Sequence, residues 1–199
     1  MKLRQLEIKL ESLEGFEKPD VSLEQYKTPA VVAARLLFHA FMKGDIEGLS
    51  VYDPGCGTGV LSVGASLLKA DYVLGVDIDR SAIEIAERNA KKLHADVEFQ
   101  VADINTFECT PFDTVVMNPP FGAQNKYADR PFIDAALRCG DVVYGIFNKG
   151  SLKFLESYTK GRAEIDETIS CSFPMKHTYA HHTRECVDIE VEIVRMIKI

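Results

Sequence analysis

The stretch Val51-Tyr52-Asp53-Pro54-Gly55-Cys56-Gly57-Thr58-Gly59 decides the fold of this 199-residue chain. Apolar residues lead into a carboxylate, and three glycines then alternate with other residues. Glycine forms tight turns and lets a ligand approach the backbone where a Cβ atom would block it. The spacing differs from the dinucleotide fingerprint G-x-G-x-x-G. The stretch therefore predicts a strand followed by a glycine loop, which suits either a ligand site or a purely structural turn.

Outward from this stretch, strand-like and helix-like segments alternate along the chain. The early strands are separated by helices, which predicts parallel pairing through right-handed crossovers. The last two strands are joined by a polar loop without a helix, which predicts an antiparallel hairpin. We expect an α/β fold with a doubly wound, mostly parallel seven-stranded sheet, a C-terminal antiparallel hairpin and N-terminal helices. The expected strands are 50–53, 72–78, 97–102, 112–117, 142–147, 163–173 and 186–197, and the expected helices between them are 59–69, 81–93, 131–139 and 151–159.

Two further helices are expected before the first strand. Leucines at helical spacing predict an amphipathic helix over residues 2–14, which Gly15 ends. Thr28 as the N-cap and Pro29 at the first helical position predict a second, strongly apolar helix over Ala30–Met42.

Composition limits the class of protein. With 46% hydrophobic residues, the chain is long enough for one sizeable core, so we expect residues 1–199 to form a single domain. The chain lacks both an apolar run of membrane-spanning length and a signal-peptide core, which predicts a cytoplasmic protein without membrane contact. A net charge of −7 argues against a generic polyanion binder. Five scattered cysteines without a C-x-x-C pair argue against a disulfide framework and against a metal site.

Polar side chains stand at the ends of successive expected strands. Asp77 ends the second strand about 20 residues after the glycine loop, where a ribose diol needs an acceptor. Asp103 follows the third strand, where a carboxylate can accept from an adenine amino group. In doubly wound sheets, ligands bind beyond the carboxyl ends of the strands. Each acid alone could be a helix cap, but together they predict a nucleoside site.

The fourth expected parallel strand ends in Asn118-Pro119-Pro120-Phe121. The Asn118 side-chain carbonyl and the Pro119 main-chain carbonyl are acceptors for the two N–H groups of a planar amine. Consecutive prolines restrict the backbone and hold both acceptors in place. Phe121 supplies a flat apolar face on which a base can stack. The motif predicts a site that orients an exocyclic or amide nitrogen, and alone it would also fit a turn.

These motifs in this order resemble class I S-adenosylmethionine-dependent methyltransferases that act on an amide or exocyclic nitrogen. Over nearly the whole chain the sequence is similar to the family of methyltransferase-like protein five. The resemblance implies a Rossmann-like fold, the cofactor S-adenosyl-L-methionine and N6-methylation of an adenosine in small-subunit ribosomal RNA. The stretches that carry the resemblance are Gly15-Phe16-Glu17-Lys18-Pro19, Leu23-Glu24-Gln25-Tyr26-x-Thr28, residues 53–62, Val76-Asp77-Ile78-Asp79, Met117-Asn118-Pro119-Pro120-Phe121-Gly122 and Val187-Asp188-Ile189-Glu190-Val191.

By position, the resemblance also assigns residues to roles. It implies that the N-terminal helical extension, residues 1–48, closes the cofactor site. It makes Asn118, Pro119, Pro120 and Phe121 catalytic. Thr58 stands where some relatives carry cysteine, which is a mild departure. The implied cofactor contacts are Gln25, Thr28, Asp53, Gly55, Thr58, Gly59, Asp77, Ile78, Asp103 and Ile104.

Other acceptors and another class of protein remain open. A protein glutamine N5-methyltransferase would present the same planar NH₂ group, although Phe121 replaces a tyrosine and few residues precede the first strand. A guanine N2 RNA methyltransferase is a second alternative, which the motif itself does not exclude. A non-catalytic cofactor-binding or assembly protein would not need the intact Asn118–Phe121 motif.

The polar loop 174–185 is a candidate RNA contact beside the same sheet edge. Its cationic side chains are expected to lie near Asn118, and Tyr179 could stack on a base. The loop departs from the lysine-rich loop of eukaryotic relatives, and a solvated loop is the alternative. The residues predicted to contact substrate RNA are Lys176, His181, His182 and Arg184, together with His177.

Residues 97–102 are expected to form an edge strand, with Val97, Phe99 and Val101 on one face. Exposed edges can pair with a strand of another chain. Relatives bind a small zinc-binding methyltransferase activator, so the resemblance implies such a partner here, besides ribosomal RNA or the small ribosomal subunit. A solvated or helix-covered edge is the alternative.

Overall fold

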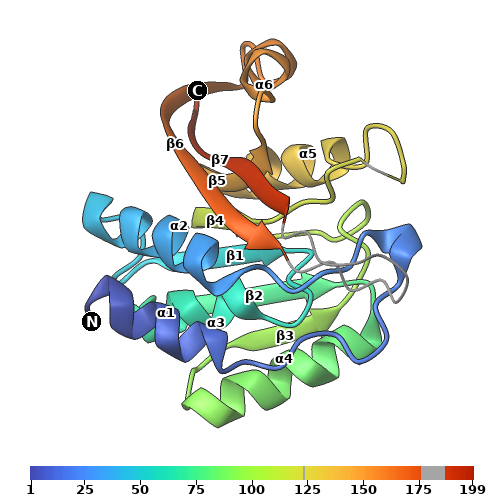
Figure 1. The fold of residues 1–199 in the computed structure, drawn as a ribbon. Coiled ribbons are helices and arrows are strands. Elements are labelled where there is room, and N and C mark those ends of the chain that lie inside the picture. Colours follow the sequence, from blue (N-terminus) through green and yellow to red (C-terminus); the bar gives the residue numbers. More distant parts are fainter. Residues whose placement is uncertain (123, 176–186) are drawn as a thin grey trace.

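A single seven-stranded sheet runs through the molecule and carries helices on both faces (Figure 1). The computed structural model describes residues 1–122, 124–175 and 187–199. Its helices are α1 (Leu3–Glu11), the short 3₁₀ helix η1 (Val21–Leu23), α2 (Ala30–Lys43), α3 (Val60–Leu67), α4 (Arg80–Leu93), α5 (Arg130–Cys139) and α6 (Leu152–Tyr158). Its strands are β1 (Ser50–Pro54), β2 (Tyr72–Asp77), β3 (Glu98–Val101), β4 (Phe112–Met117), β5 (Gly140–Asn148), β6 (Ala163–Met175) and β7 (Val187–Lys198).

The strand order is β3-β2-β1-β4-β5-β7-β6, which confirms the predicted doubly wound sheet. Strands β1 to β5 pair in parallel, and β7 pairs antiparallel with both β5 and β6. The chain order reverses at β1, which has β2 on one side and β4 on the other. This reversal places the ends of β1, β2 and β4 around one crevice, the usual ligand position in such sheets.

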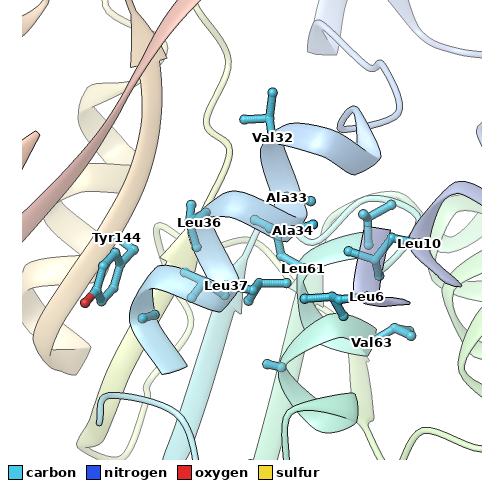
Figure 2. Close-up of a cluster of buried hydrophobic side chains, with 14 of the residues drawn as sticks. Leu6, Leu10, Val32, Ala33, Ala34, Leu36, Leu37, Leu61, Val63 and Tyr144 are labelled. Atoms are coloured by element: carbon cyan, nitrogen blue, oxygen red, sulfur yellow. The ribbon is translucent and has the colours of Figure 1, made fainter. Parts of the chain in front are cut away.

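Alternating strand residues divide the core into two parts. Val51 and Val73 face one cluster, which α1, α2 and α3 cover, whereas Tyr52 and Leu74 face the other, which α5 and α6 cover. This follows from the two-residue period of a strand, because successive side chains point to opposite faces. In Figure 2, side chains of α1, α2 and α3 meet in the first cluster, where Leu6, Leu10, Leu36 and Leu37 are fully buried. The N-terminal helices are thus part of the main core.

Two N-terminal boundaries differ from the prediction. Helix α1 ends at Glu11 and is capped by Ser12, so Gly15 does not end it. Helix α2 begins at Ala30, and Pro29 is its N-cap without a side-chain hydrogen bond. The prediction of Thr28 as the cap was therefore wrong by one residue. Its hydroxyl instead accepts a hydrogen bond from another part of the chain, as described below.

The cysteines also differ from the prediction, because Cys109 and Cys139 form a disulfide. Thirty residues separate the two in sequence, so their spacing resembles no motif. The sheet brings them together: Cys109 precedes β4, Cys139 ends α5, and Phe112 of β4 pairs with Gly140 of β5. Cys56 and Cys171 are free and buried.

Among residues 1–122, 124–175 and 187–199, no helix is both long enough and apolar enough to span a lipid bilayer.

The disulfide should contribute measurably to stability. Closing a loop of this length restricts the unfolded chain and is worth about 3 to 4 kcal/mol in the loop-entropy model. We expect Cys109→Ser with Cys139→Ser to lower the free energy of unfolding by roughly that amount in denaturant titrations. Reductant should remove the difference by destabilising the wild type and leaving the double variant unchanged. A wild type insensitive to reductant would contradict the prediction.

Candidate functional site

A cavity of about 250 Å³ lies at the carboxyl ends of β1, β2 and β4. The opposite wall of the cavity consists of residues between Phe16 and Thr28, in the segment that connects α1 to α2. Among the described residues that line it, Glu24, Asp53, Asp77 and Asp103 are acidic and none is basic. The cavity is therefore suited to a ligand that carries positive charge, and it disfavours phosphate groups.

The fold gathers most of the predicted site residues around this cavity, although they come from five separate stretches of the chain. Nine of the ten expected cofactor contacts line it, and two of the four expected catalytic residues do so. These lining residues are Gln25, Thr28, Asp53, Gly55, Thr58, Asp77, Ile78, Asp103, Ile104, Asn118 and Pro120.

Three predicted site residues do not line the cavity. Gly59 has a φ of +80°, and a Cβ atom there would lie 3.0 Å from Ala86 and 3.1 Å from Phe99, so packing explains its glycine. Pro119 is buried. Phe121 packs at the edge of the core. The predicted RNA contacts Lys176, His177, Tyr179, His181, His182 and Arg184 lie outside the described residues.

Two buried carboxylates hold the glycine loop. Asp77 accepts hydrogen bonds from the main-chain N–H groups of Gly57 at 2.8 Å and Asp79 at 2.9 Å. Asp53 accepts from the main-chain N–H and the hydroxyl of Ser62, at 3.0 and 2.5 Å, and so ties β1 to α3. Burial raises the pKa of Asp53 to about 7 and also raises the pKa of Asp77, against the effect of these hydrogen bonds. A cation in the cavity would favour the ionised form of both groups.

The loop after β3 presents Asp103 and Ile104 to the cavity. One carboxylate oxygen of Asp103 accepts from the main-chain N–H of Asn105 at 2.9 Å and from its side chain at 2.7 Å. Arg138 of α5 donates to the Ile104 carbonyl at 3.0 Å. The Cys109–Cys139 disulfide joins the far end of this loop to the same helix.

Asn118 is held from two sides by the N-terminal segment. The Tyr26 hydroxyl donates to the Asn118 Oδ1 atom at 3.1 Å, and the Asn118 amide group donates to the Thr28 hydroxyl at 3.0 Å. Burial raises the pKa of Tyr26 far above its usual value, so at neutral pH the phenol keeps the proton that it donates. These two bonds hold the Asn118 amide in place, and Oδ1 retains a second lone pair.

Tyr26 is a site residue that sequence reasoning missed. It lies between Gln25 and Thr28, both of which were expected at the site, and this position was the available signal. Its ring lies 5.7 Å from the ring of Phe121, so the same side chain braces both ends of the motif. Glu24 adds a further brace, because its carboxylate accepts from the main-chain N–H groups of Gly122 and Gln124.

Comparison with known proteins shows which family has this arrangement. The chain is 32% identical to the rRNA N(6)-adenosine-methyltransferase METTL5 of Danio rerio, and the match covers 98% of each chain. It belongs to the METTL5 family. An uncharacterized protein of Methanocaldococcus jannaschii is 37% identical over 100% of this chain and 95% of its own length.

The METTL5-family fold is also seen in a solved structure. A Pyrococcus horikoshii protein proposed to be an RNA methyltransferase matches with a TM-score of 0.92 and 36% identity, covering 100% of this chain and 98% of its own. A family model described as Ribosomal protein L11 methyltransferase (PrmA) matches residues 34–119. That match includes the glycine loop and Asp77 and ends within the Asn118–Phe121 motif.

The bond from Tyr26 to Asn118 should matter for turnover in this METTL5-family protein. Tyr26→Phe removes the hydroxyl and keeps the ring against Phe121. Because a hydrogen bond contributes about 0.5 to 1.5 kcal/mol, we expect kcat to fall about two- to tenfold with little change in cofactor affinity by calorimetry. Tyr72→Phe is the matched control, since that hydroxyl donates to the exposed Glu98 away from the cavity. Equal kcat for both variants would show that the Tyr26–Asn118 hydrogen bond does not contribute to turnover.

Proposed function

We propose that this protein transfers a methyl group from S-adenosyl-L-methionine to the N6 atom of an adenosine in small-subunit ribosomal RNA. The observation that carries the proposal is the Asn118 amide, fixed by Tyr26 and Thr28 at an acidic cavity. Membership in the METTL5 family supports the enzyme class, the RNA substrate and the cofactor.

The cavity fits this cofactor by charge and by the position of its acceptors. S-adenosylmethionine carries a sulfonium, an ammonium and a carboxylate group and no phosphate. Its net positive charge suits a lining with four acids and no base among its described members. We propose that Asp77 binds the ribose diol and that Asp103, with Ile104, holds the adenine. Gln25, Thr28, Gly55, Thr58 and Ile78 would complete the contacts, and Asp53 would act through the loop that it anchors.

We propose that residues 1–48 close the site. This segment supplies Phe16, Leu23 and Gln25 to the lining, besides Tyr26 and Thr28 at Asn118. Gln25 is itself fixed, because it donates to Asp79 at 2.8 Å and accepts from the Asp20 main-chain N–H at 2.8 Å. The segment therefore links the cofactor cavity to the proposed acceptor site.

The proposed chemistry relies on orientation. The lone pair of an adenine N6 amine is delocalised into the ring, so the amine is a weak nucleophile. Acceptors at Asn118 Oδ1 and at the Pro119 carbonyl would bind its two N–H groups and favour a more tetrahedral nitrogen as the bond to carbon forms. The cofactor would supply an activated methyl group on a good leaving group, so the N–C bond forms as the S–C bond breaks. The methylated nitrogen then loses its surplus proton to water. Asn118 is then an orienting group and not a general base, while Pro120 and Phe121 shape the place of the target base.

A protein glutamine acceptor receives no comparable support. The match to the L11 methyltransferase model ends at residue 119 and covers the cofactor half of the site, which enzymes with different acceptors can share. A guanine N2 acceptor is chemically close to adenine N6, and identification of the product distinguishes the two.

The direct test is Asn118→Ala. Loss of a fixed polar group at a reacting centre typically costs a factor of about 10² to 10³, so we expect transfer of tritiated methyl to small ribosomal subunits to fall about a hundredfold or more. Cofactor affinity should stay nearly unchanged. Asn148→Ala, at the exposed end of β5, is the control. After nuclease digestion, the labelled nucleoside should be N6-methyladenosine. Retained activity in Asn118→Ala, or label that appears in a ribosomal protein in place of RNA, would refute the proposal.

We further propose that a small zinc-binding activator protein pairs with the edge strand β3. This strand is at the edge of the sheet, bonded only to β2 among the described strands. The Ala102 N–H donates to the Asp77 carbonyl at 3.0 Å, so by alternation the main-chain groups of Phe99 and Val101 point away from β2. Val101 is 40% exposed, and these outward groups are available to an added strand.

Val101→Pro tests strand addition specifically. Proline removes the outward N–H and keeps the inward bonds of Gln100 and Ala102, so the fold should tolerate it at an edge. We expect the variant to lose the complex with the co-expressed activator in size-exclusion chromatography, with an unchanged unfolding temperature. Val101→Ala should keep the complex. If the proline variant still binds, the partner does not add a strand to β3.

A further inference from the structure

An arginine packed among aromatic rings stands beside the cavity. Arg130, the first residue of α5, has its guanidinium carbon 3.8 Å from the centre of the Tyr127 ring. The same carbon is 5.2 Å from the ring centre of Tyr158 and 5.6 Å from that of Phe154, both on α6. Arginine stacks well on aromatic faces. The rings therefore fix the position of this charge.

Arg130 forms no ion pair with a described carboxylate. The half-buried Asp129, next to it in sequence, attracts its charge without forming an ion pair. The buried Nε atom of Arg130 has no hydrogen-bond partner among the described residues. Arg162 also lies over the Tyr158 ring, but it is paired with Asp134 at 2.7 Å. Arg130 as a whole is partly exposed, but leaving its buried Nε atom without a hydrogen bond is unfavourable. A phosphate that reaches Arg130 from solvent would supply an ion-pair partner for the guanidinium.

Tyr127 supplies an exposed ring next to this charge. The residue has a φ of +71°, which is unusual for a large side chain, and it is 49% exposed. Lys126 lies on the ring as well, with its Nζ atom 4.8 Å from the ring centre. One strained position thus presents a half-exposed aromatic ring with two cations close to it.

The chain connects this cluster directly to the proposed acceptor site. After Asn118 and Pro120 the chain leaves the cavity, and it returns at Pro131 and Phe132, which line the cavity again. Arg130 immediately precedes Pro131. Figure 1 shows this connection (yellow) projecting beyond the end of β4 beside α5. An RNA strand whose target base enters the cavity would leave its neighbouring nucleotide beside this connection, at the rim of the cavity.

We propose that Tyr127 and Arg130, supported by Phe154 and Tyr158, bind the RNA nucleotide next to the target adenosine. The Tyr127 ring stacks on its base, and the Arg130 guanidinium binds its phosphate. The acidic cavity repels phosphates, so the strand needs a cation outside it, and the net charge of −7 gives little general attraction. This inference rests on the proposed RNA substrate and extends it to a defined contact.

The two residues should give different signatures in salt titrations. The probe is a short, fluorescently labelled single-stranded RNA with one adenosine, measured by anisotropy. Arg130→Gln removes one phosphate contact, so we expect weaker binding and a slope of log K against log salt that is shallower by about 0.7. Tyr127→Ala removes a stacking surface, so affinity should fall about fivefold to a hundredfold with an unchanged slope. In methylation of small ribosomal subunits, both variants should raise KM more than they lower kcat.

Control variants separate this role from a purely structural one. Arg162→Gln removes the paired arginine over the same Tyr158 ring and should leave the slope unchanged. Arg130→Lys keeps the charge, so it should keep the slope while weakening binding. Cofactor affinity should be unchanged in every variant. If Arg130→Gln lowers the unfolding temperature, Tyr127→Ala decides, because its half-exposed ring can be removed without opening the core.

The outcomes also separate this inference from the proposed function. Wild-type slope and affinity in both Arg130→Gln and Tyr127→Ala overturn the contact, even if the wild type methylates adenosine. Displacement of the RNA by polyglutamate at equal charge concentration also overturns it, because the surface would then be one for acidic peptides. If the variants lose RNA binding as expected and the wild type methylates no adenosine, Tyr127 and Arg130 are still an RNA contact, and the proposed adenosine acceptor fails.

Discussion

The structure depends on two carboxylates that are buried at the ends of adjacent parallel strands. Asp53 and Asp77 are 1% and 9% exposed, and both accept hydrogen bonds from the glycine loop or the helix that follows it. These bonds offset the cost of burying charge, and they hold the loop open as one wall of the cavity. The two carboxylates also contribute to the acidity of the cavity, and this acidity determines the class of cofactor that the cavity fits.

The N-terminal segment holds the Asn118 side of the cavity in place. Helices α1 and α2 are part of the main core, so the chain between them is held at both ends while it crosses the cavity. From that position Tyr26 and Thr28 fix the Asn118 amide, and Glu24 fixes the backbone after the motif. Such bonding benefits an amide that must present its oxygen to an amine, because it restricts the rotation of the side chain before the amine binds.

Charge is divided between the cavity and its rim. Four acids line the cavity, whereas Lys126 and Arg130 lie on the connection that leaves and re-enters it. A cationic cofactor and a polyanionic substrate have opposite electrostatic requirements, and this separation of charge meets both. The Arg138 contact and the Cys109–Cys139 disulfide link the Asp103 loop to α5, the helix that begins with Arg130.

The sequence by itself determined the doubly wound, mostly parallel sheet with its C-terminal hairpin and the polar residues at the strand ends. Those features depend on local periodicity and on short motifs such as residues 51–59, whose signal lies within a few residues of chain. Only the tertiary structure decided that Thr28 bonds Asn118 instead of capping α2, that Tyr26 orients the amide, that Cys109 meets Cys139, and that Arg130 lies among three rings. Tyr26 and Asn118 are 92 residues apart, and local patterns carry no information about contacts at that separation. The physical reason is that such contacts arise from packing helices against a completed sheet, which places side chains together that no sequence period relates.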